Sequence, residues 1–223
     1  MTTHHINSGA RPAGPDSPPE RTGVRALDEA IRGTVEPATL ARLLDDLAER
    51  ADHDGSLDVG YDVVDTPIGG LLLAATPRGL VRVAFETEGY DAVLTNLAER
   101  ISPRILRAPG RLAPVRAQVA EYFEGRRRQF SVEVDLSLTK GFRREVLDEL
   151  RAVEFGERVT YTTLAARSGR ARAVRATASA CATNPLPVVV PCHRVVRSDG
   201  SLGGYRGGLP AKERLLALES VAA

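Results

Sequence analysis

The residues best suited to covalent chemistry are Cys192 and His193, which come directly after Pro191 at the end of an apolar run. The thiolate is the reactive form of cysteine, and a neighbouring imidazole or a helix N-terminus can lower the thiol pKa from about 8.5 toward neutrality. Pro191 fixes a backbone angle and removes a donor, so the chain can turn sharply there and expose the Cys-His pair. A Cys-His pair in isolation is more often a buried structural cysteine beside a surface histidine. The rest of the chain must therefore decide between these two interpretations.

Positive charge is concentrated at the C-terminal end of the chain, around this pair. The 223 residues carry a net charge of +1, but residues 140–223 hold 14 basic and 8 acidic groups, whereas residues 1–57 hold 6 basic and 10 acidic groups. A one-sided basic excess is typical of proteins with a polyanionic partner such as nucleic acid.

The cysteine count and the apolar runs indicate a compartment. Cys181 and Cys192 are the only cysteines, too few for a disulfide framework or a four-cysteine zinc site, which favours a reducing environment. The N-terminus has no apolar signal core, and no apolar run is long enough to span a membrane. We expect a soluble cytoplasmic protein.

The first 57 residues contain two different segments. Residues 1–36 are rich in Pro, Gly, Ser and Thr without a periodic apolar pattern, which predicts a disordered tail. Residues 37–57 predict an amphipathic helix followed by the linker Asp54-Gly55-Ser56. The leucine stripe of this helix could dock on the main body or on a partner, and we expect the body; its members are Leu40, Leu43, Leu44 and Leu47.

Residues 58–138 predict a small α+β domain. Strand-like runs at 61–64, 71–75 and 80–85 are separated by turn sequences, which indicates a β-meander, and helical patterns come next at 90–101 and 112–124. No catalytic cluster stands out here, so we expect this domain to act as a support.

Residues 139–223 predict a mostly helical domain that carries Cys192. A helix closed by Gly169, a basic turn and a helix of small residues at 174–183 give the outline of a helix-turn-helix. Small side chains let a helix backbone approach a nucleic-acid groove closely, and the long Arg175 could reach past that surface. An alanine-rich helix also packs well against neighbouring helices, and both interpretations stay open on composition alone.

Several short stretches taken together resemble the O6-alkylguanine-DNA alkyltransferases, also called methylated-DNA–protein-cysteine methyltransferases. The resemblance runs from about residue 58 to 219, and its most specific part is the Pro-Cys-His-Arg-Val box with its downstream glycines. The matching stretches are Gly156 to Tyr161, Arg175-Ala176, Asn184-Pro185, Pro191 to Val196, Gly203 to Leu209, Lys212-Glu213, Leu215-Leu216 and Glu219. The family implies a ribonuclease-H-like N-terminal domain and a winged-helix-like C-terminal domain.

The resemblance implies a suicidal repair reaction that needs no cofactor and no metal. The protein would act as a monomer on double-stranded DNA containing O6-alkylguanine, with O4-alkylthymine as a second lesion. The roles correspond to those of a catalytic triad. Cys192 would accept the alkyl group, His193 would act as its base through a water, Glu219 would orient His193, Asn184 would hold the active-site turn, and Tyr161 would bind guanine N3.

The resemblance also implies a DNA surface and a base pocket. The lesion must be flipped out of the duplex through the minor groove, and Arg175 would fill the vacated place. The remaining DNA contacts would be Ala176, Thr177, Ala178, Ser179, Arg172 and Arg194. The pocket would be formed by Pro187, Val195, Gly203, Tyr205, Arg206 and Gly207.

The chain departs from the family at three points. Relatives usually have two glycines where Ala178 and Ser179 stand, so we expect a looser fit to the groove and weaker DNA binding here. Arg172 competes with Arg175 for the intercalating role. Some relatives bind zinc through N-terminal cysteines that this chain lacks.

Two other functions are compatible with parts of this pattern. Alkyltransferase-like proteins share the fold, lack the cysteine and only flag lesions, but Cys192 is present here. A cysteine hydrolase would use the same Cys-His-Glu set, yet it leaves the helix-turn-helix and Arg175 unexplained.

Overall fold

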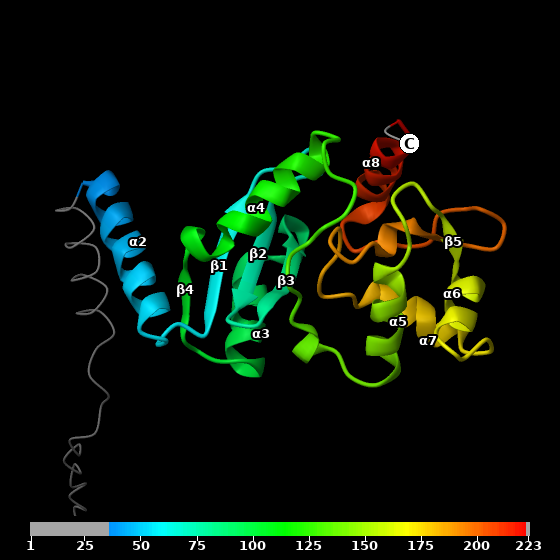
Figure 1. Cartoon of the computed structure of the whole chain (residues 1–223), viewed down its shortest axis with the longest axis horizontal. Coiled ribbons are helices and arrows are strands. Elements are labelled where there is room, and N and C mark those ends of the chain that lie inside the picture. The colour runs from blue at the N-terminus through cyan, green and yellow to red at the C-terminus, as the bar shows by residue number, and fades with distance from the viewer. Residues whose placement is uncertain (1–35, 222–223) are drawn as a thin grey trace, which may run out of the picture. The chain divides into compact units, whose positions relative to one another are not determined.

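The computed structural model describes residues 36–221 (Figure 1). Of these, residues 36–42 belong to one compact unit and residues 43–221 to a second. The predicted tail therefore lies outside the described residues except for Glu36. The predicted amphipathic helix is present as α2 (Pro37–His53). None of the helices between residues 36 and 221 is both long and apolar enough to cross a membrane.

The leucine stripe of α2 is partly exposed. Leu43, Leu44 and Leu47 remain about half exposed, whereas Ala48 is buried and packs with Leu57 and Ala108.

The predicted β-meander is confirmed, and a fourth strand joins it. Strands β1 (Val59–Val64), β2 (Leu71–Thr76) and β3 (Gly79–Phe85) pair in antiparallel fashion. We did not predict β4 (Ile105–Arg107), which pairs in parallel with β1 and gives the order β3-β2-β1-β4. Three residues are too few to show an alternating pattern, and only the crossover through a helix brings them to the edge of β1.

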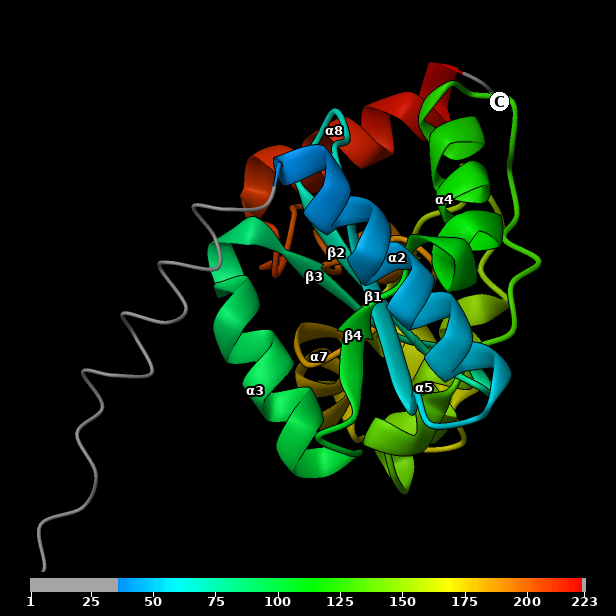
Figure 2. The same ribbon diagram turned by 90° about the vertical axis from the view of Figure 1, so that its left-hand side faces the viewer.

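One helix covers each face of this sheet (Figure 2). Helix α3 (Tyr90–Arg100) packs through Val93 and Leu97 against alternate strand residues such as Leu72 and Val81, and η1 (Glu86–Glu88) precedes it. Helix α4 (Pro109–Phe123) packs on the face that contains Leu71, Leu73 and Val83. Every residue of β2 is buried for this reason, which explains its unbroken apolar sequence.

The second domain is helical, as predicted, and it contains the helix-turn-helix formed by α6 and α7. Two short parallel strands, β5 and β6, join the start of α6 to the stretch after Cys192. The segment that connects the domains contains η2 (Leu136–Leu138). The elements of the second domain are α5 (Phe142–Arg151), β5 (Val159–Thr160), α6 (Tyr161–Arg167), α7 (Val174–Ala182), η3 (Cys192–Arg194), β6 (Val195–Val196) and α8 (Gly208–Val221).

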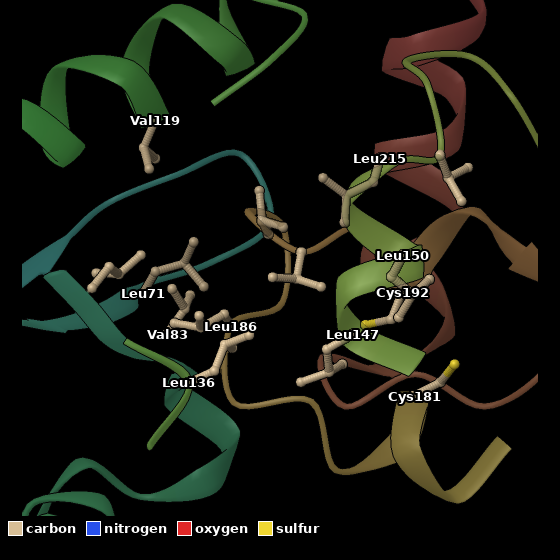
Figure 3. Packing of buried hydrophobic residues seen from close by; sticks show 14 of the residues in the cluster. Leu71, Val83, Val119, Leu136, Leu147, Leu150, Cys181, Leu186, Cys192 and Leu215 are labelled. Atoms are coloured by element: carbon tan, nitrogen blue, oxygen red, sulfur yellow. The ribbon is translucent and has the colours of Figure 1, made fainter. Parts of the chain in front are cut away.

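The loop that leads to Cys192 lies against the edge strand of the sheet. The Val83 N–H donates a hydrogen bond of 2.8 Å to the Pro185 carbonyl oxygen, so β3 is not a free edge. In Figure 3, Leu186 of this loop lies beside Val83 and Leu136, in the buried cluster that also contains Cys192. The two domains therefore share one apolar core, and this core fixes the position of the Cys192 loop.

Gly79→Ala should destabilise the sheet. Gly79 has φ +129°, and a Cβ there would lie 2.4 Å from the backbone carbonyl oxygen of Glu133. We expect the free energy of unfolding to fall by about 2 kcal/mol or more, measured by urea denaturation. Gly110→Ala, in the first turn of α4 with no atom within 4 Å of its Cβ, is the control and should be neutral or slightly stabilising. Equal effects of the two substitutions would contradict the steric explanation.

Candidate active site

The side chain of Asn184 holds the turn that presents Cys192. Its Nδ2 donates to the Val190 carbonyl oxygen at 2.8 Å and to Cys192 Sγ at 3.2 Å, while its Oδ1 accepts from the Leu186 N–H at 2.9 Å. One buried amide therefore fixes both ends of the loop and contacts the sulfur directly. Val188, within the same loop, has φ +73°, a strained conformation for a β-branched residue that the surrounding core must maintain.

Cys192 is buried, with only 5% of its surface exposed. Burial raises the pKa of the thiol, and the hydrogen bond from Asn184 and the charge of Lys212 oppose this effect only in part. The expectation that the neighbouring imidazole lowers the thiol pKa toward neutrality is therefore not met. Desolvation disfavours the thiolate more than the surrounding donors favour it.

Glu219, near the C-terminal end of α8, is the most heavily hydrogen-bonded group of the site. Its Oε1 contacts His193 Nε2 at 2.9 Å and accepts from the Tyr122 hydroxyl at 2.7 Å. Arg194 donates to both carboxylate oxygens, with its Nε 2.9 Å from Oε2 and its Nη2 2.9 Å from Oε1, and the Gly156 N–H lies 3.3 Å from Oε2. Burial alone would raise the pKa of Glu219, but the hydrogen bonds from His193 and Arg194 outweigh it and lower this pKa to about 2.

The charge on Glu219 determines which nitrogen of His193 carries the proton. Because the carboxylate can only accept, a neutral His193 must donate from Nε2 and keep its lone pair on Nδ1. Nδ1 is buried and has no hydrogen-bond partner among the described residues. Burial lowers the pKa of His193 despite Glu219, so the imidazole is neutral and Nδ1 is free to accept a proton.

The glycine-rich loop after β6 lies between an aromatic residue from each domain. A Cβ on Gly203 would lie 2.5 Å from the hydroxyl oxygen of Tyr161, and a Cβ on Gly207 would lie 2.5 Å from the ring of Phe85. Lys212 is fully buried beneath this loop and donates to the carbonyl oxygens of Val195 at 2.7 Å and Gly203 at 3.3 Å. The loop can take this path only because its glycines have no side chains.

The other pocket residues that we predicted surround the same loop. Tyr205 packs edge-on against Phe85, with ring centroids 5.6 Å apart, and its ring centroid lies 6.3 Å from that of His193. Arg206 binds the Ala182 carbonyl oxygen at the end of α7, at 3.0 Å from Nη2. Pro187 is buried in the loop before Cys192.

The predicted DNA contacts divide into two groups. The first group is accessible to DNA: Ala178 is half-buried, and the other members are exposed, namely Arg172, Arg175, Ala176 and Ser179. Thr177 points inward instead: it is fully buried and its hydroxyl donates to the Ala173 carbonyl oxygen at 3.1 Å.

Arg194 is also misassigned as a DNA contact. It is buried, binds Glu219 and donates to the Val153 carbonyl oxygen, so its guanidinium serves the interior of the site. The reason is local: η3 is a single turn, and its residues face the core rather than the recognition helix.

The N-terminal domain contributes residues that we did not predict. Tyr122 of α4 binds Glu219, and Glu88 forms ion pairs with both Arg82 of β3 and Arg206 of the glycine-rich loop. The domain is thus more than a support. Tyr122 and Phe123 at the end of an amphipathic helix are typical of core packing. No spacing in the sequence relates Tyr122 to Glu219, which comes 97 residues later.

A buried thiol beside a histidine whose Nδ1 has no partner among residues 36–221, in one domain with a helix-turn-helix, is an arrangement compatible with cysteine chemistry on a nucleic-acid-binding fold. The ribonuclease-like domain of 6-O-methylguanine DNA methyltransferase matches residues 59–136, and the DNA binding domain of that family matches residues 141–221. The chain belongs to the 6-O-methylguanine DNA methyltransferase family.

Individual relatives agree with this assignment. The methylated-DNA–protein-cysteine methyltransferase of Mycolicibacterium paratuberculosis is 36% identical over 161 residues, covering 72% of this chain and 92% of that protein. The crystal structure of the O6-methylguanine methyltransferase of Mycobacterium tuberculosis superposes with a TM-score of 0.66 at 33% identity, covering 74% of this chain and 94% of that one. The bifunctional transcriptional activator/DNA repair enzyme Ada of Escherichia coli is 37% identical, but this chain spans only 49% of its length.

Stability at acidic pH should depend on Glu219. Its pKa of about 2 in the folded state lies below its ordinary value of 4.5, so the ionised side chain stabilises the fold fully above pH 4.5 and progressively less as the pH falls toward 2. The difference corresponds to about 3 kcal/mol. In urea denaturation across this range, Glu219→Gln should lower stability near neutral pH and show a flatter acid limb.

Glu213→Gln is the matched control, since it makes the same change at an exposed position of α8. It should leave the acid limb as in the unmodified protein. An unchanged acid limb in Glu219→Gln would refute the assigned ionisation.

Proposed function

We propose that this protein repairs O6-alkylguanine in double-stranded DNA, and O4-alkylthymine as a second lesion, by moving the alkyl group once and irreversibly onto its own Cys192. The observation that carries this proposal is the sulfur of Cys192, held by Asn184 in the turn before a histidine whose Nδ1 is unpartnered among the described residues and whose Nε2 is bound to Glu219. Family membership and relatives named as methylated-DNA–protein-cysteine methyltransferases support it.

The thiol is activated by proton transfer during the reaction. Burial keeps both the Cys192 thiol and the His193 imidazole neutral at rest. The Cys192 proton passes through a water to Nδ1 of His193, and Glu219 stabilises the imidazolium that forms. Asn184 then donates its hydrogen bond to a sulfur that has become negative, which makes that bond stronger in the transition state than in the ground state.

The second half of the reaction concerns the leaving group. The sulfur attacks the alkyl carbon, the carbon–sulfur bond forms, the carbon–O6 bond breaks, and its electron pair stays on guanine. Burial raises the pKa of Tyr161 to about 12, so its hydroxyl is protonated and can donate to guanine N3 as negative charge develops. Guanine takes up one proton, which balances the proton that the thiol gave to His193, and Cys192 remains as a thioether.

Access to Cys192 requires the damaged nucleotide to leave the duplex. The exposed positions Arg175 and Ala176 support docking of α7 in the minor groove, with Arg175 in the vacated stack. The base then enters between Tyr161 and the glycine-rich loop, and main-chain groups near Val195 of β6 and Arg206 of the loop read its edge. We further propose that the protein acts as a monomer. We place it in the cytoplasm, at the nucleoid, because its DNA substrate is there.

Intact-protein mass spectrometry with peptide mapping tests the transfer. After incubation with a duplex that carries one O6-methylguanine, we expect a mass gain of one methylene on Cys192, at no more than one equivalent per protein. Cys192→Ala should abolish the gain and keep lesion binding, whereas Cys181→Ala removes the other buried thiol and should leave transfer intact. Lesion binding without any mass gain in the unmodified protein would instead favour a damage-flagging role.

Arg175→Ala should slow transfer from duplex DNA by about tenfold or more, because flipping costs a few kcal/mol that the inserted side chain offsets. The reaction with free O6-alkylguanine base needs no flipping and should stay within about twofold. Single-turnover rates on both substrates measure the effect. Arg172→Ala is the matched control, and a larger duplex-specific loss in that variant would transfer the role to Arg172.

A further inference from the structure

A groove of about 820 Å³ runs between α3, the segment that connects the domains and α7. Figures 1 and 2 show α3 and α7 in the two domains that this connecting segment joins. Five cationic side chains line the groove, and none of its lining residues is acidic. The cations are Arg82, Arg100, Lys140, Arg143 and Arg206.

Three of these cations are available for a ligand. Arg82 and Arg206 share Glu88 as their ion-pair partner and are therefore partly neutralised. Lys140 and Arg143 are exposed and make no ion pair within residues 36–221. Arg100 is exposed as well, and its Nη2 donates to the Leu138 carbonyl oxygen at 3.0 Å, which fixes the guanidinium beside the connecting segment without neutralising it.

The groove runs along one flank of the helix that we propose to dock on DNA. Ala176, Ala180 and Thr183 line it at intervals of four and three residues, which places them on one side of α7. A helix in a minor groove has one sugar-phosphate backbone on each side. The backbone on this flank would therefore meet the groove.

We propose that this groove binds phosphates of the DNA backbone beside the lesion, and that Arg100 gives the N-terminal domain a direct contact with DNA. This inference rests on the proposed function only for the orientation of α7. Charge complementarity supports a phosphodiester ligand, because the exposed cations are spread over two domains and face a groove without carboxylates. Since the groove contains Arg206, bound phosphate would also adjoin the glycine-rich loop of the base pocket.

The test uses the full chain and an unmodified duplex labelled for fluorescence anisotropy. Arg100→Gln, Lys140→Gln and the double variant should each weaken binding by about threefold to tenfold per charge removed. The slope of log K against log salt should become shallower by about 0.9 for each lost phosphate contact. Arg126→Gln, which removes an exposed arginine of the N-terminal domain outside the groove, is the control and should leave the slope unchanged.

The outcomes separate this inference from the proposed function. Unchanged slopes in both groove variants, with melting temperatures that show intact folding, would overturn the groove proposal even if Cys192 accepts the alkyl group. Shallower slopes in the groove variants would uphold it even if the unmodified protein failed to transfer. The rate with free O6-alkylguanine base should be the same in the groove variants as in the unmodified protein, since no phosphate takes part; a lower rate would show that the substitutions act on the pocket instead.

Discussion

The buried carboxylate of Glu219 is the group on which the rest of the site depends. Removing a carboxylate from water costs several kcal/mol unless charge and hydrogen bonds replace the solvent. Here Arg194 supplies the opposite charge, and His193, Tyr122 and the Gly156 N–H supply further donors. These groups come from α4, the loop after α5 and the turn that contains Cys192. Ionised Glu219 thus links both domains to one position.

Arg194 also changes what Glu219 can do for His193. Since the carboxylate is already balanced by a guanidinium, its field does not hold the imidazole in the protonated form, and burial keeps His193 neutral. The thiol is neutral because it too is buried. The site therefore holds no preformed thiolate. A buried neutral thiol is a poor target for oxidants, because the thiolate is the reactive form of cysteine.

The N-terminal domain takes part in the site through three contacts. Tyr122 donates to Glu219, Phe85 packs against Gly207, and Glu88 joins Arg82 to Arg206. These contacts reach both the active-site network and the glycine-rich loop. The strand and helix pattern of this domain suggests only a scaffold, but its contacts help to set the positions of Glu219 and of the glycine-rich loop.

The sequence by itself determined most of the local elements and the family to which the chain belongs. The meander, helices α2, α3 and α4 and the small-residue helix α7 were predictable, because each depends on residues close together in the chain, but α8, which carries Glu219, was not predicted. Asn184 contacts Cys192, and the next residue, His193, contacts Glu219. Thr177 and Arg194 were misassigned because a sequence position does not state which face of a turn or helix is buried.

Only the tertiary structure decided the protonation states and the contacts between the domains. A thiol pKa depends on the water that folding removes, so a Cys-His sequence cannot give the direction of its shift. Tyr122 and Glu219 are separated by 97 positions, and β4 pairs only after a helical crossover. Such long-range partners result from packing of the whole chain. For that reason the sequence alone could place Cys192 beside His193 and relate both to Glu219, whereas the contacts of Tyr122, Arg194 and Gly156 with Glu219 could be found only in the folded structure.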